Sequence, residues 1–141
     1  ATLEQQHNAM LEKGVNKVSP FFIPMMISNM AAGTVSIKTG FKGANFATVT
    51  ACSSSTHAIG EAFRKIKDGY LDICVCGGTE STVTEFALGG FSNMKALTKS
   101  SDLERASIPF DKERSGFVLG EGCGILVLEE YEHTKPRIVP I

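Results

Sequence analysis

The sequence lacks any marked excess of charge of one sign and any long apolar run. Its 141 residues carry 14 Lys and Arg against 15 Asp and Glu, for a net charge of −1. Because no dense basic stripe stands out, nucleic acid and anionic membrane surfaces are disfavoured as partners. No apolar stretch is long enough to span a bilayer, and the N-terminus lacks the basic and apolar regions of a signal peptide. These absences predict a globular, cytoplasmic chain.

The four cysteines also lack the spacing of paired zinc knuckles or of a small secreted disulfide scaffold. Cys74 and Cys76 are two positions apart in an apolar run, so a strand would direct both side chains to one face as small core residues. A metal site there would need further ligands, and no histidine or other cysteine stands near at ligand spacing. We therefore expect reduced thiols and no metal.

The run VTACSSSTHA, residues 49–58, carries the strongest indication of chemistry. Cys52 stands between a β-branched apolar segment and an amphipathic helix, at a turn where enzymes place nucleophiles. A thiol there faces the unpaired N–H groups of the first helical turn and the positive end of the helix dipole, which favours the thiolate. Ser53, Ser54 and Ser55 leave the turn uncrowded and can cap the helix. Cys52 is the candidate nucleophile, and the alternative is a buried cysteine that packs between strand and helix.

Hydrophobic periodicity predicts an α/β chain. We expect an amphipathic helix over about 3–13 that ends at Gly14, and an apolar helix from Pro24 to near Gly40. The second helix is apolar on several sides and needs cover from its own chain or from a second subunit. A strand over 45–51, a helix closed by Asp68-Gly69 and a buried strand over 71–76 predict a βαβ unit of a parallel sheet. Cys52 lies at the carboxyl end of its first strand, where open α/β sheets place their sites.

The last third of the chain gives weaker patterns. Gly77-Gly78 predicts a tight turn into a short helix that reaches Leu88. Residues 98–115 are polar and predict a surface loop, and a further strand is expected from about Gly124 to Glu130. The segment from Lys135 to the end predicts no regular element.

Three blocks resemble the beta-ketoacyl-[acyl-carrier-protein] synthases of the condensing-enzyme class, most closely the type II elongating synthases of bacterial fatty-acid synthesis. The blocks are SPFFIP at 19–24 with Asn29-Met30, TACSSSTH at 50–57, and PFDKERSGFVLGEG at 109–122. The resemblance extends to about His133, after which the tail departs from the family. It implies a thiolase-like layered α-β-α fold containing the nucleophile βαβ unit. Residues 1–141 would be an internal ketosynthase segment, mostly from the N-terminal thiolase-like half and incomplete on both sides.

The resemblance also implies a reaction, 3-oxoacyl-[acyl-carrier-protein] synthesis in fatty-acid elongation. Cys52 matches the nucleophile that accepts an acyl group from acyl carrier protein, before a decarboxylative Claisen condensation with malonyl carrier protein. The substrates travel on the phosphopantetheine arm of acyl carrier protein, so no cofactor of the enzyme is expected. Family members are normally homodimers.

Other positions gain roles only through the resemblance. Two lysines, Lys17 and Lys95, match basic residues that meet acyl carrier protein, although an isolated surface lysine is usually just solvated. Four apolar residues match the acyl pocket or its surroundings: Ala87, Phe91, Phe117 and Phe22. Each could instead be a core residue, and this alternative applies above all to Phe22.

The family's two catalytic histidines, its lysine and its Gly-Phe loop are not found in the sequence. His57 lies five positions after Cys52 on the same helix, so we expect it to form a hydrogen bond within the core. His7 and His133 are expected to face solvent. The resemblance therefore implies that the chain alone is inactive in condensation.

Two other interpretations remain open. A polyketide ketosynthase shares the Cys-Ser-Ser-Ser turn, although the continuation THAIG at 56–60 favours fatty-acid synthesis. A non-catalytic dimerisation or interaction module would use the apolar helix from Pro24 and the Phe21-Phe22 corner, and its thiol would be inert. An inactive homologue that sets chain length is disfavoured, because such proteins lack the cysteine.

Overall fold

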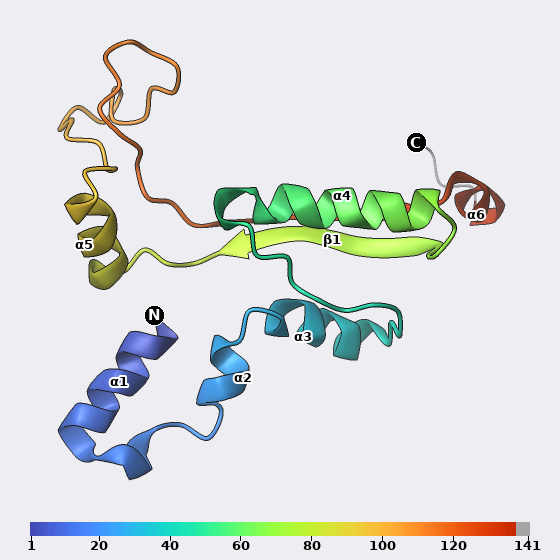
Figure 1. Ribbon diagram of the computed structural model, residues 1–141, viewed down its shortest axis with the longest axis horizontal. Coiled ribbons are helices and arrows are strands. Elements are labelled where there is room, and N and C mark those ends of the chain that lie inside the picture. The colour runs from blue at the N-terminus through green and yellow to red at the C-terminus, as the bar shows by residue number, and fades with distance from the viewer. Residues whose placement is uncertain (138–141) are drawn as a thin grey trace. The chain divides into compact units, whose positions relative to one another are not determined.

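The computed structural model, which describes residues 1–137, divides into two units that pack within themselves (Figure 1). The first unit combines residues 1–18 with residues 80–122. The second combines residues 19–79 with the chain from Cys123 onward.

The first unit is mainly helical. Its helix α1 ends at Lys13, and Gly14 follows as the C-cap with a φ of 90°, which glycine adopts readily. The helix predicted over 3–13 is therefore confirmed. Its helix α5 begins at Glu85 and is capped by Thr84, whose hydroxyl accepts a hydrogen bond from the Ala87 N–H at 3.2 Å. The elements are α1 (Thr2–Lys13), a 3₁₀ turn (Val15–Lys17) and α5 (Glu85–Asn93).

The second unit contains the two strands and the helix that follows Cys52. Helix α4 ends next to Gly69 at φ 76°, as the Asp68-Gly69 pair predicts. The helices are α2 (Phe22–Met26), α3 (Met30–Thr39), α4 (Ser54–Lys67) and α6 (Tyr131–Thr134), with 3₁₀ turns at Ala51–Ser53 and Lys135–Arg137. The strands are β1 (Ile73–Glu80) and β2 (Gly122–Glu129).

The two strands form one antiparallel pair. The N–H of Glu130, just beyond the end of β2, donates to the carbonyl of Asp72, just before β1, at 2.8 Å. Further along β1, Gly77 lies against Gly124 near the start of β2. The strand expected near 124–130 is therefore confirmed. The predicted parallel pairing of residues 45–51 with residues 71–76 is not found among the described residues, where β1 pairs with β2.

Several predicted boundaries are wrong. The single helix expected from Pro24 is interrupted at Ile27, where ψ of 136° ends α2 before α3 begins. Residues 44–50 form no strand, because no other described strand pairs with their backbone. The expected βαβ unit thus retains its helix and its second strand only. At the C-terminal end, Lys135–Arg137 form a 3₁₀ turn where no element was expected, and residues 138–141 lie outside the described residues.

The pair Gly77-Gly78 continues β1 instead of turning. A Cβ at Gly77 would lie 2.1 Å from the Gly124 carbonyl oxygen, and one at Gly78 would lie 1.8 Å from the Ser55 hydroxyl oxygen. The two glycines therefore permit a close approach of strand to strand and of strand to helix. The helix that follows, α5, begins and ends later than predicted because the strand runs on to Glu80.

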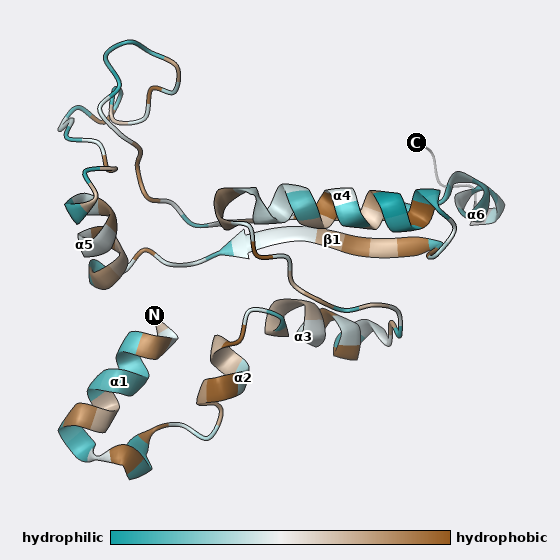
Figure 2. Cartoon of the chain, in the orientation of Figure 1, coloured by the Kyte–Doolittle hydropathy of each residue, from teal (hydrophilic) through white to brown (hydrophobic). Residues whose placement is uncertain are grey.

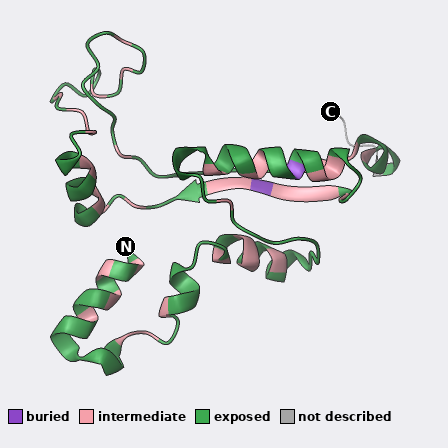
Figure 3. Cartoon of the chain, in the orientation of Figure 1, coloured by how far each residue is buried: buried purple, intermediate pink, exposed green. Residues whose placement is uncertain are grey.

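The core of the described chain is small. Ala62 of α4 and Cys76 of β1 are its buried apolar residues (Figure 3). Figure 2 shows hydrophilic and hydrophobic bands alternating along α4, whereas the first half of β1 is hydrophobic. Helix α3 was expected to be covered, but Ile37 is 80% exposed on it. Within residues 1–137 we find no helix with the length and apolar character that a membrane crossing needs.

Candidate active site at Cys52

Cys52 lies in the 3₁₀ turn Ala51–Ser53, directly before the 14-residue helix α4. Ala51 adopts a left-handed φ of 52°, a conformation that costs an L-residue about 1–2 kcal/mol. The sharp bend places the Cys52 side chain at the start of the helical segment, where the first N–H groups have no partner inside the segment. The thiol is exposed. Exposure contradicts the alternative of a buried packing cysteine.

Hydroxyl groups close this turn on both sides of Cys52. The Ser54 hydroxyl accepts from the Thr50 N–H at 2.9 Å and donates to the Ala51 carbonyl at 2.7 Å. The Ser53 hydroxyl donates to the Thr50 carbonyl at 2.9 Å, and the Thr48 hydroxyl donates to the Ser54 carbonyl at 2.7 Å. Ser53 is the N-cap residue of α4 but forms no side-chain cap, so the expected capping role of the serines is replaced by bonds to the turn itself.

The N-terminus of α4 is packed tightly against β1. The close approach of Ser55 to Gly78 sets α4 alongside the strand, as Figure 1 shows. Nearer the start of β1, burial raises the pKa of the Cys74 thiol, and Lys65 opposes this shift with its positive charge. Burial also raises the pKa of the Cys76 thiol, with a smaller contribution from Cys74. These two thiols therefore remain protonated to higher pH than a free cysteine, as expected for core residues.

Three of the four predicted acyl-pocket residues lie in the first unit. Phe91 and Phe117 contact each other edge to face, with ring centroids 5.4 Å apart. Ala87 lies one helical turn before Phe91 on α5, so the two share a face of the helix. The backbone fixes Phe117, because its N–H donates to Ala96 at 3.0 Å and its carbonyl accepts from Thr98 at 2.9 Å.

A shallow hollow of about 350 Å³ lies beside Phe117. Its walls come from one continuous stretch of the third resemblance block and the residues before it. They are Ser107, Ile108, Pro109, Phe110, Arg114, Gly116 and Phe117.

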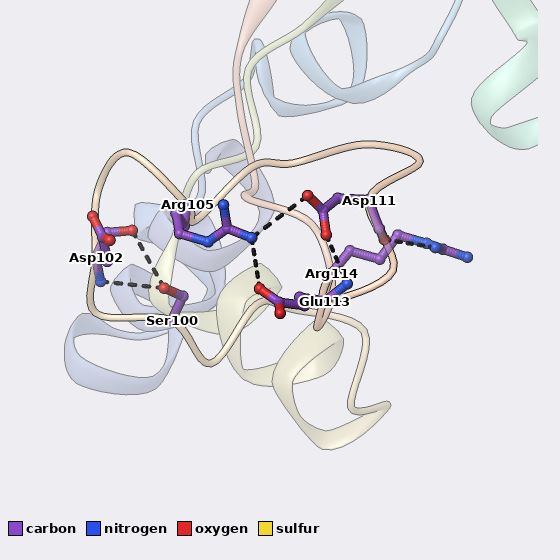
Figure 4. Close-up of polar contacts among 6 residues, drawn as sticks. All are labelled: Ser100, Asp102, Arg105, Asp111, Glu113 and Arg114. Atoms are coloured by element: carbon purple, nitrogen blue, oxygen red, sulfur yellow. Dashed lines mark hydrogen bonds and ion pairs between the residues drawn. The ribbon is translucent and has the colours of Figure 1, made fainter.

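Ion pairs tie the same loop together (Figure 4). One guanidinium nitrogen of Arg105 lies 2.9 Å from Glu113 and 3.5 Å from Asp111. Asp111 also accepts a hydrogen bond from the Glu113 N–H at 2.7 Å, and the Arg114 guanidinium donates to the Asp111 carbonyl at 2.8 Å. These charged groups, together with neutral bonds such as that between the Thr98 and Ser115 hydroxyls at 3.0 Å, order the polar loop predicted over 98–115.

The remaining predicted residues are spread over both units. Phe22 begins α2 in the second unit and is half-buried. Lys17 ends a 3₁₀ turn of the first unit and is exposed. Lys95 is also exposed, and it has a φ of 58° directly after Met94, the C-cap residue of α5. The structure thus brings Ala87, Phe91 and Phe117 together in one unit.

The histidines differ partly from expectation. His57 is exposed on α4, so the predicted hydrogen bond within the core is wrong. His7 is exposed as predicted, and His133 is exposed while its ring nitrogen contacts the Glu129 carboxylate. Among residues 1–137 no group of three or more His, Cys, Asp or Glu side chains could hold a metal ion.

Sequence reasoning missed several residues that shape these regions. Thr48 and Arg105 were not singled out, and the Glu121 carboxylate accepts from the Ser81 hydroxyl at 3.2 Å and from the Val83 N–H at 2.9 Å. The run of three serines after Cys52 was a usable signal for the turn network. The polar composition of residues 98–115 predicts only a surface loop and gives no sign of its ion pairs.

The sequence matches a family model described as the N-terminal domain of beta-ketoacyl synthase over residues 1–134. The chain belongs to the beta-ketoacyl synthase family. It is 50% identical over 136 residues to 3-oxoacyl-[acyl-carrier-protein] synthase 2 of Synechocystis, covering 96% of this chain and 33% of that protein. The protein of the same name from Staphylococcus aureus is 49% identical, with 96% and 34% covered. The chain thus spans about a third of the length of these relatives.

Solved ketosynthase structures share the fold. A type II polyketide ketosynthase, described in complex with its acyl carrier protein and bound to the hexaketide, matches with a TM-score of 0.90 at 29% identity, over 96% of this chain and 35% of that one. A beta-ketoacyl synthase from Burkholderia phymatum matches with a TM-score of 0.82 at 33% identity, over 97% and 34%. The predicted thiolase-like α/β fold is therefore confirmed for this family member.

Proposed function

We propose that this beta-ketoacyl synthase chain carries the acyl-accepting nucleophile, Cys52, of a 3-oxoacyl-[acyl-carrier-protein] synthase. The observation that carries the proposal is the exposed Cys52 thiol on a strained turn at the start of α4. The similarity to proteins named 3-oxoacyl-[acyl-carrier-protein] synthase 2 supports fatty-acid elongation as the setting. This makes the parent protein an acyltransferase.

The proposed chemistry begins with attack of the Cys52 thiolate on the thioester carbonyl of an acyl group carried by acyl carrier protein. The new carbon–sulfur bond forms as the bond to the carrier's thiol breaks, and that thiol leaves with a proton. The Cys52 N–H is proposed to stabilise the intermediate oxyanion, a contribution of roughly 2.7–4 kcal/mol for one such donor. Malonyl carrier protein then loses carbon dioxide, and its carbanion attacks the Cys52 thioester. The products are 3-oxoacyl carrier protein and the free thiolate.

The condensation half of this reaction needs hydrogen-bond donors for the thioester enolate. We do not propose His7, His57 or His133 for that role. The proposal for residues 1–137 is therefore limited to the acyl-transfer half, and the family's histidine pair and lysine would belong to other parts of the parent protein.

The acyl chain is proposed to lie against four apolar residues. The edge-to-face contact of Phe91 with Phe117 supports a shared apolar wall, and the small side chain of Ala87 lies one turn earlier on the same helix face. Phe22 is proposed for the far end of the pocket or the dimer contact. Replacing a small residue such as Ala87 by a larger one would shorten the preferred acyl chain.

Acyl carrier protein is the proposed partner, and Lys17 and Lys95 are its proposed contacts. Both lysines are exposed, and a related ketosynthase is described in complex with its acyl carrier protein. The substrates arrive on the carrier's phosphopantetheine, so no cofactor of the enzyme enters the proposal. We also propose a cytoplasmic homodimer, for which the exposed apolar side chains of α3 offer a surface.

Acylation of Cys52 tests the proposed function directly. The intact protein is incubated with acyl-loaded carrier protein or with cerulenin, an inhibitor directed at the acyl-site cysteine, and the modified peptide is located by mass spectrometry. One adduct is expected at Cys52, and none in Cys52→Ala. Cys123 is exposed as well, so Cys123→Ala is a matched control and should label normally. Labelling that persists in Cys52→Ala would refute the assignment, and a Cys52 that resists both reagents would favour a non-catalytic interaction module.

A polyketide ketosynthase is the second candidate. The TM-score of 0.90 to a type II polyketide ketosynthase favours it, whereas the higher sequence identity to fatty-acid synthases favours the first. Product analysis separates the two, because a fatty-acid enzyme would accept saturated acyl chains and a polyketide enzyme would extend 3-oxo chains.

A further inference from the structure

The strain at Ala51 needs a cause in the surrounding structure. A non-glycine residue stays in the left-handed region only where neighbouring interactions hold it there, and such strain concentrates at functional sites. Ala51 directly precedes Cys52, so the conformation of Ala51 sets the direction in which the Cys52 side chain leaves the turn. The groups that hold Ala51 therefore control the position of the proposed nucleophile.

Ser54 is the residue whose side chain reaches across this turn. Its single hydroxyl accepts from the Thr50 N–H at 2.9 Å and donates to the Ala51 carbonyl at 2.7 Å. One oxygen thus links the backbone on both sides of the Ala51 φ and ψ rotations. We propose that Ser54 is a positioning residue for Cys52, because its hydroxyl locks Ala51 in the left-handed conformation. This inference rests on the proposed role of Cys52 as nucleophile.

The neighbouring hydroxyls have lesser parts in the turn. The Ser53 hydroxyl donates to the Thr50 carbonyl. That carbonyl also accepts a hydrogen bond from the Ser53 N–H at 3.2 Å, so it keeps a partner without the hydroxyl. Thr48 donates to the Ser54 carbonyl and so acts on the helix side. Ser54 is thus the residue whose hydroxyl bonds to the backbone both before and after the Ala51 rotations, and its side chain is half-buried.

Ser55 supports the same arrangement from the helix. Its side chain fits against Gly78 of β1 with no space for a Cβ. The start of α4 is therefore held against the strand while Ser54 holds the turn that leads into it. A misplacement of reacting atoms by about 1 Å can slow a reaction roughly 100-fold.

The experiment compares Ser54→Thr with Ser54→Val in the intact protein. The two replacements have the same shape and differ in the hydroxyl, so a difference between them reports the hydroxyl itself. Single-turnover acyl transfer from acyl carrier protein to Cys52 is measured over a range of carrier concentrations. We expect the maximal rate to fall roughly 10- to 100-fold in Ser54→Val and to stay within about threefold of the unmodified protein in Ser54→Thr. The carrier concentration for half-maximal rate should stay unchanged, because the substitution leaves the proposed carrier contacts intact.

A second readout does not depend on acyl transfer. Iodoacetamide alkylation of Cys52 is measured relative to that of the exposed Cys123 in the same sample, and protection of the buried Cys76 reports that the fold is kept. The ratio should fall in Ser54→Val and recover in Ser54→Thr. If the protein accepts no acyl group, the proposed function is refuted, and the alkylation ratios still decide whether Ser54 positions Cys52. The inference is overturned if Ser54→Val keeps both rates, or if Ser54→Thr is as slow as Ser54→Val.

Discussion

The Cys52 turn and the charged loop of residues 98–116 each hold a non-glycine residue in the left-handed region, and they hold it by different means. Ala51 has a φ of 52° and Phe110 a φ of 68°. Around Ala51 the bonds are neutral, from the Ser54 hydroxyl to backbone groups. Around Phe110 the Asp111 N–H donates to the Ile108 carbonyl at 3.2 Å, and the ion pairs of Arg105 with Asp111 and Glu113 add to this neutral bond. A nucleophile turn held by neutral bonds keeps its geometry when ionic strength changes, whereas a loop held in part by exposed ion pairs loosens.

The two regions also differ in where a close approach fixes them. Gly78 faces the Ser55 side chain, which can rotate in part, whereas Gly116 faces backbone atoms of Ala96 and Leu97. A backbone-to-backbone approach thus fixes the base of the charged loop. The Cys52 turn is held by the Ser54 bonds and by the contact of the Ser55 side chain with β1.

The largest effect is expected for Gly116→Ala, at the base of the charged loop. A Cβ there would lie 2.4 Å from the Leu97 carbonyl carbon, and Gly116 has a φ of 146°. Backbone atoms cannot move aside without breaking the Leu97–Phe117 bridge, so we expect a loss of about 3 kcal/mol or more in the free energy of unfolding. Denaturant unfolding of the intact protein measures it. Gly120→Ala is the control, since nothing lies within 4 Å of its Cβ position; equal losses in both variants would show that the close approach is not the cause.

Gly78→Ala should have a smaller effect, in the Cys52 region. The clash falls on the Ser55 hydroxyl oxygen at 1.8 Å, which can rotate away, and on the Ser55 Cβ at 2.8 Å, which moves only with the helix, so a loss of about 1–3 kcal/mol is expected. Because Ser55 is in the first turn of α4, acylation of Cys52 should slow as well. Gly60→Ala, within the same helix and with open space around its Cβ position, should instead stabilise by about 0.5–1 kcal/mol. Unchanged stability and unchanged acylation in Gly78→Ala would show that the contact of Ser55 with Gly78 does not support this turn.

Strand β1, against which the start of α4 packs, gives a pH dependence. Burial raises the pKa of the Cys76 thiol in the folded state, so the unfolded state loses this proton first as pH rises. The stability contributed by the neutral thiol is complete below pH 9.0, the ordinary value, and is lost above it. Unfolding of the protein at pH 8 and pH 10 should show the decrease, and Cys76→Ala should reduce its slope. A Cys76→Ala slope equal to that of the unmodified protein would assign the decrease to other groups.

The sequence predicted best those features that depend on short-range pattern. The amphipathic helix predicted over 3–13 and ended by Gly14 is α1, and the helix predicted to close at Asp68-Gly69 is α4. Both helices follow from amphipathic periodicity and from a glycine able to end them. The position of Cys52 at the start of a helix followed from the same reasoning.

Features that depend on partners could not be predicted in this way. A strand over 45–51 has suitable β-branched residues, but strand formation needs a hydrogen-bonded neighbour that residue pattern does not reveal. The break at Ile27 depends on one extended ψ angle within an apolar run that reads as continuous helix. Likewise, the run of serines after Cys52 indicated helix caps, because the alternative bonds of Ser54 to Thr50 and Ala51 depend on a φ at Ala51 that no residue type requires.

The smallest effect is expected for Arg105→Gln, which removes the ion pairs of the charged loop. The Arg105 side chain is 46% exposed and its partners are similarly open to solvent, so the loss should be about 1 kcal/mol or less. Raising the salt concentration should weaken the unmodified loop and leave Arg105→Gln unaffected, and hydrogen exchange of the Glu113 N–H reports the loop locally. Arg105→Lys keeps the charge without the planar guanidinium and should fall between the two. The same salt change should leave the ratio of Cys52 to Cys123 alkylation constant, because the Ser54 bonds are neutral; a ratio that follows salt as the loop does would show that the two regions are held by the same forces after all.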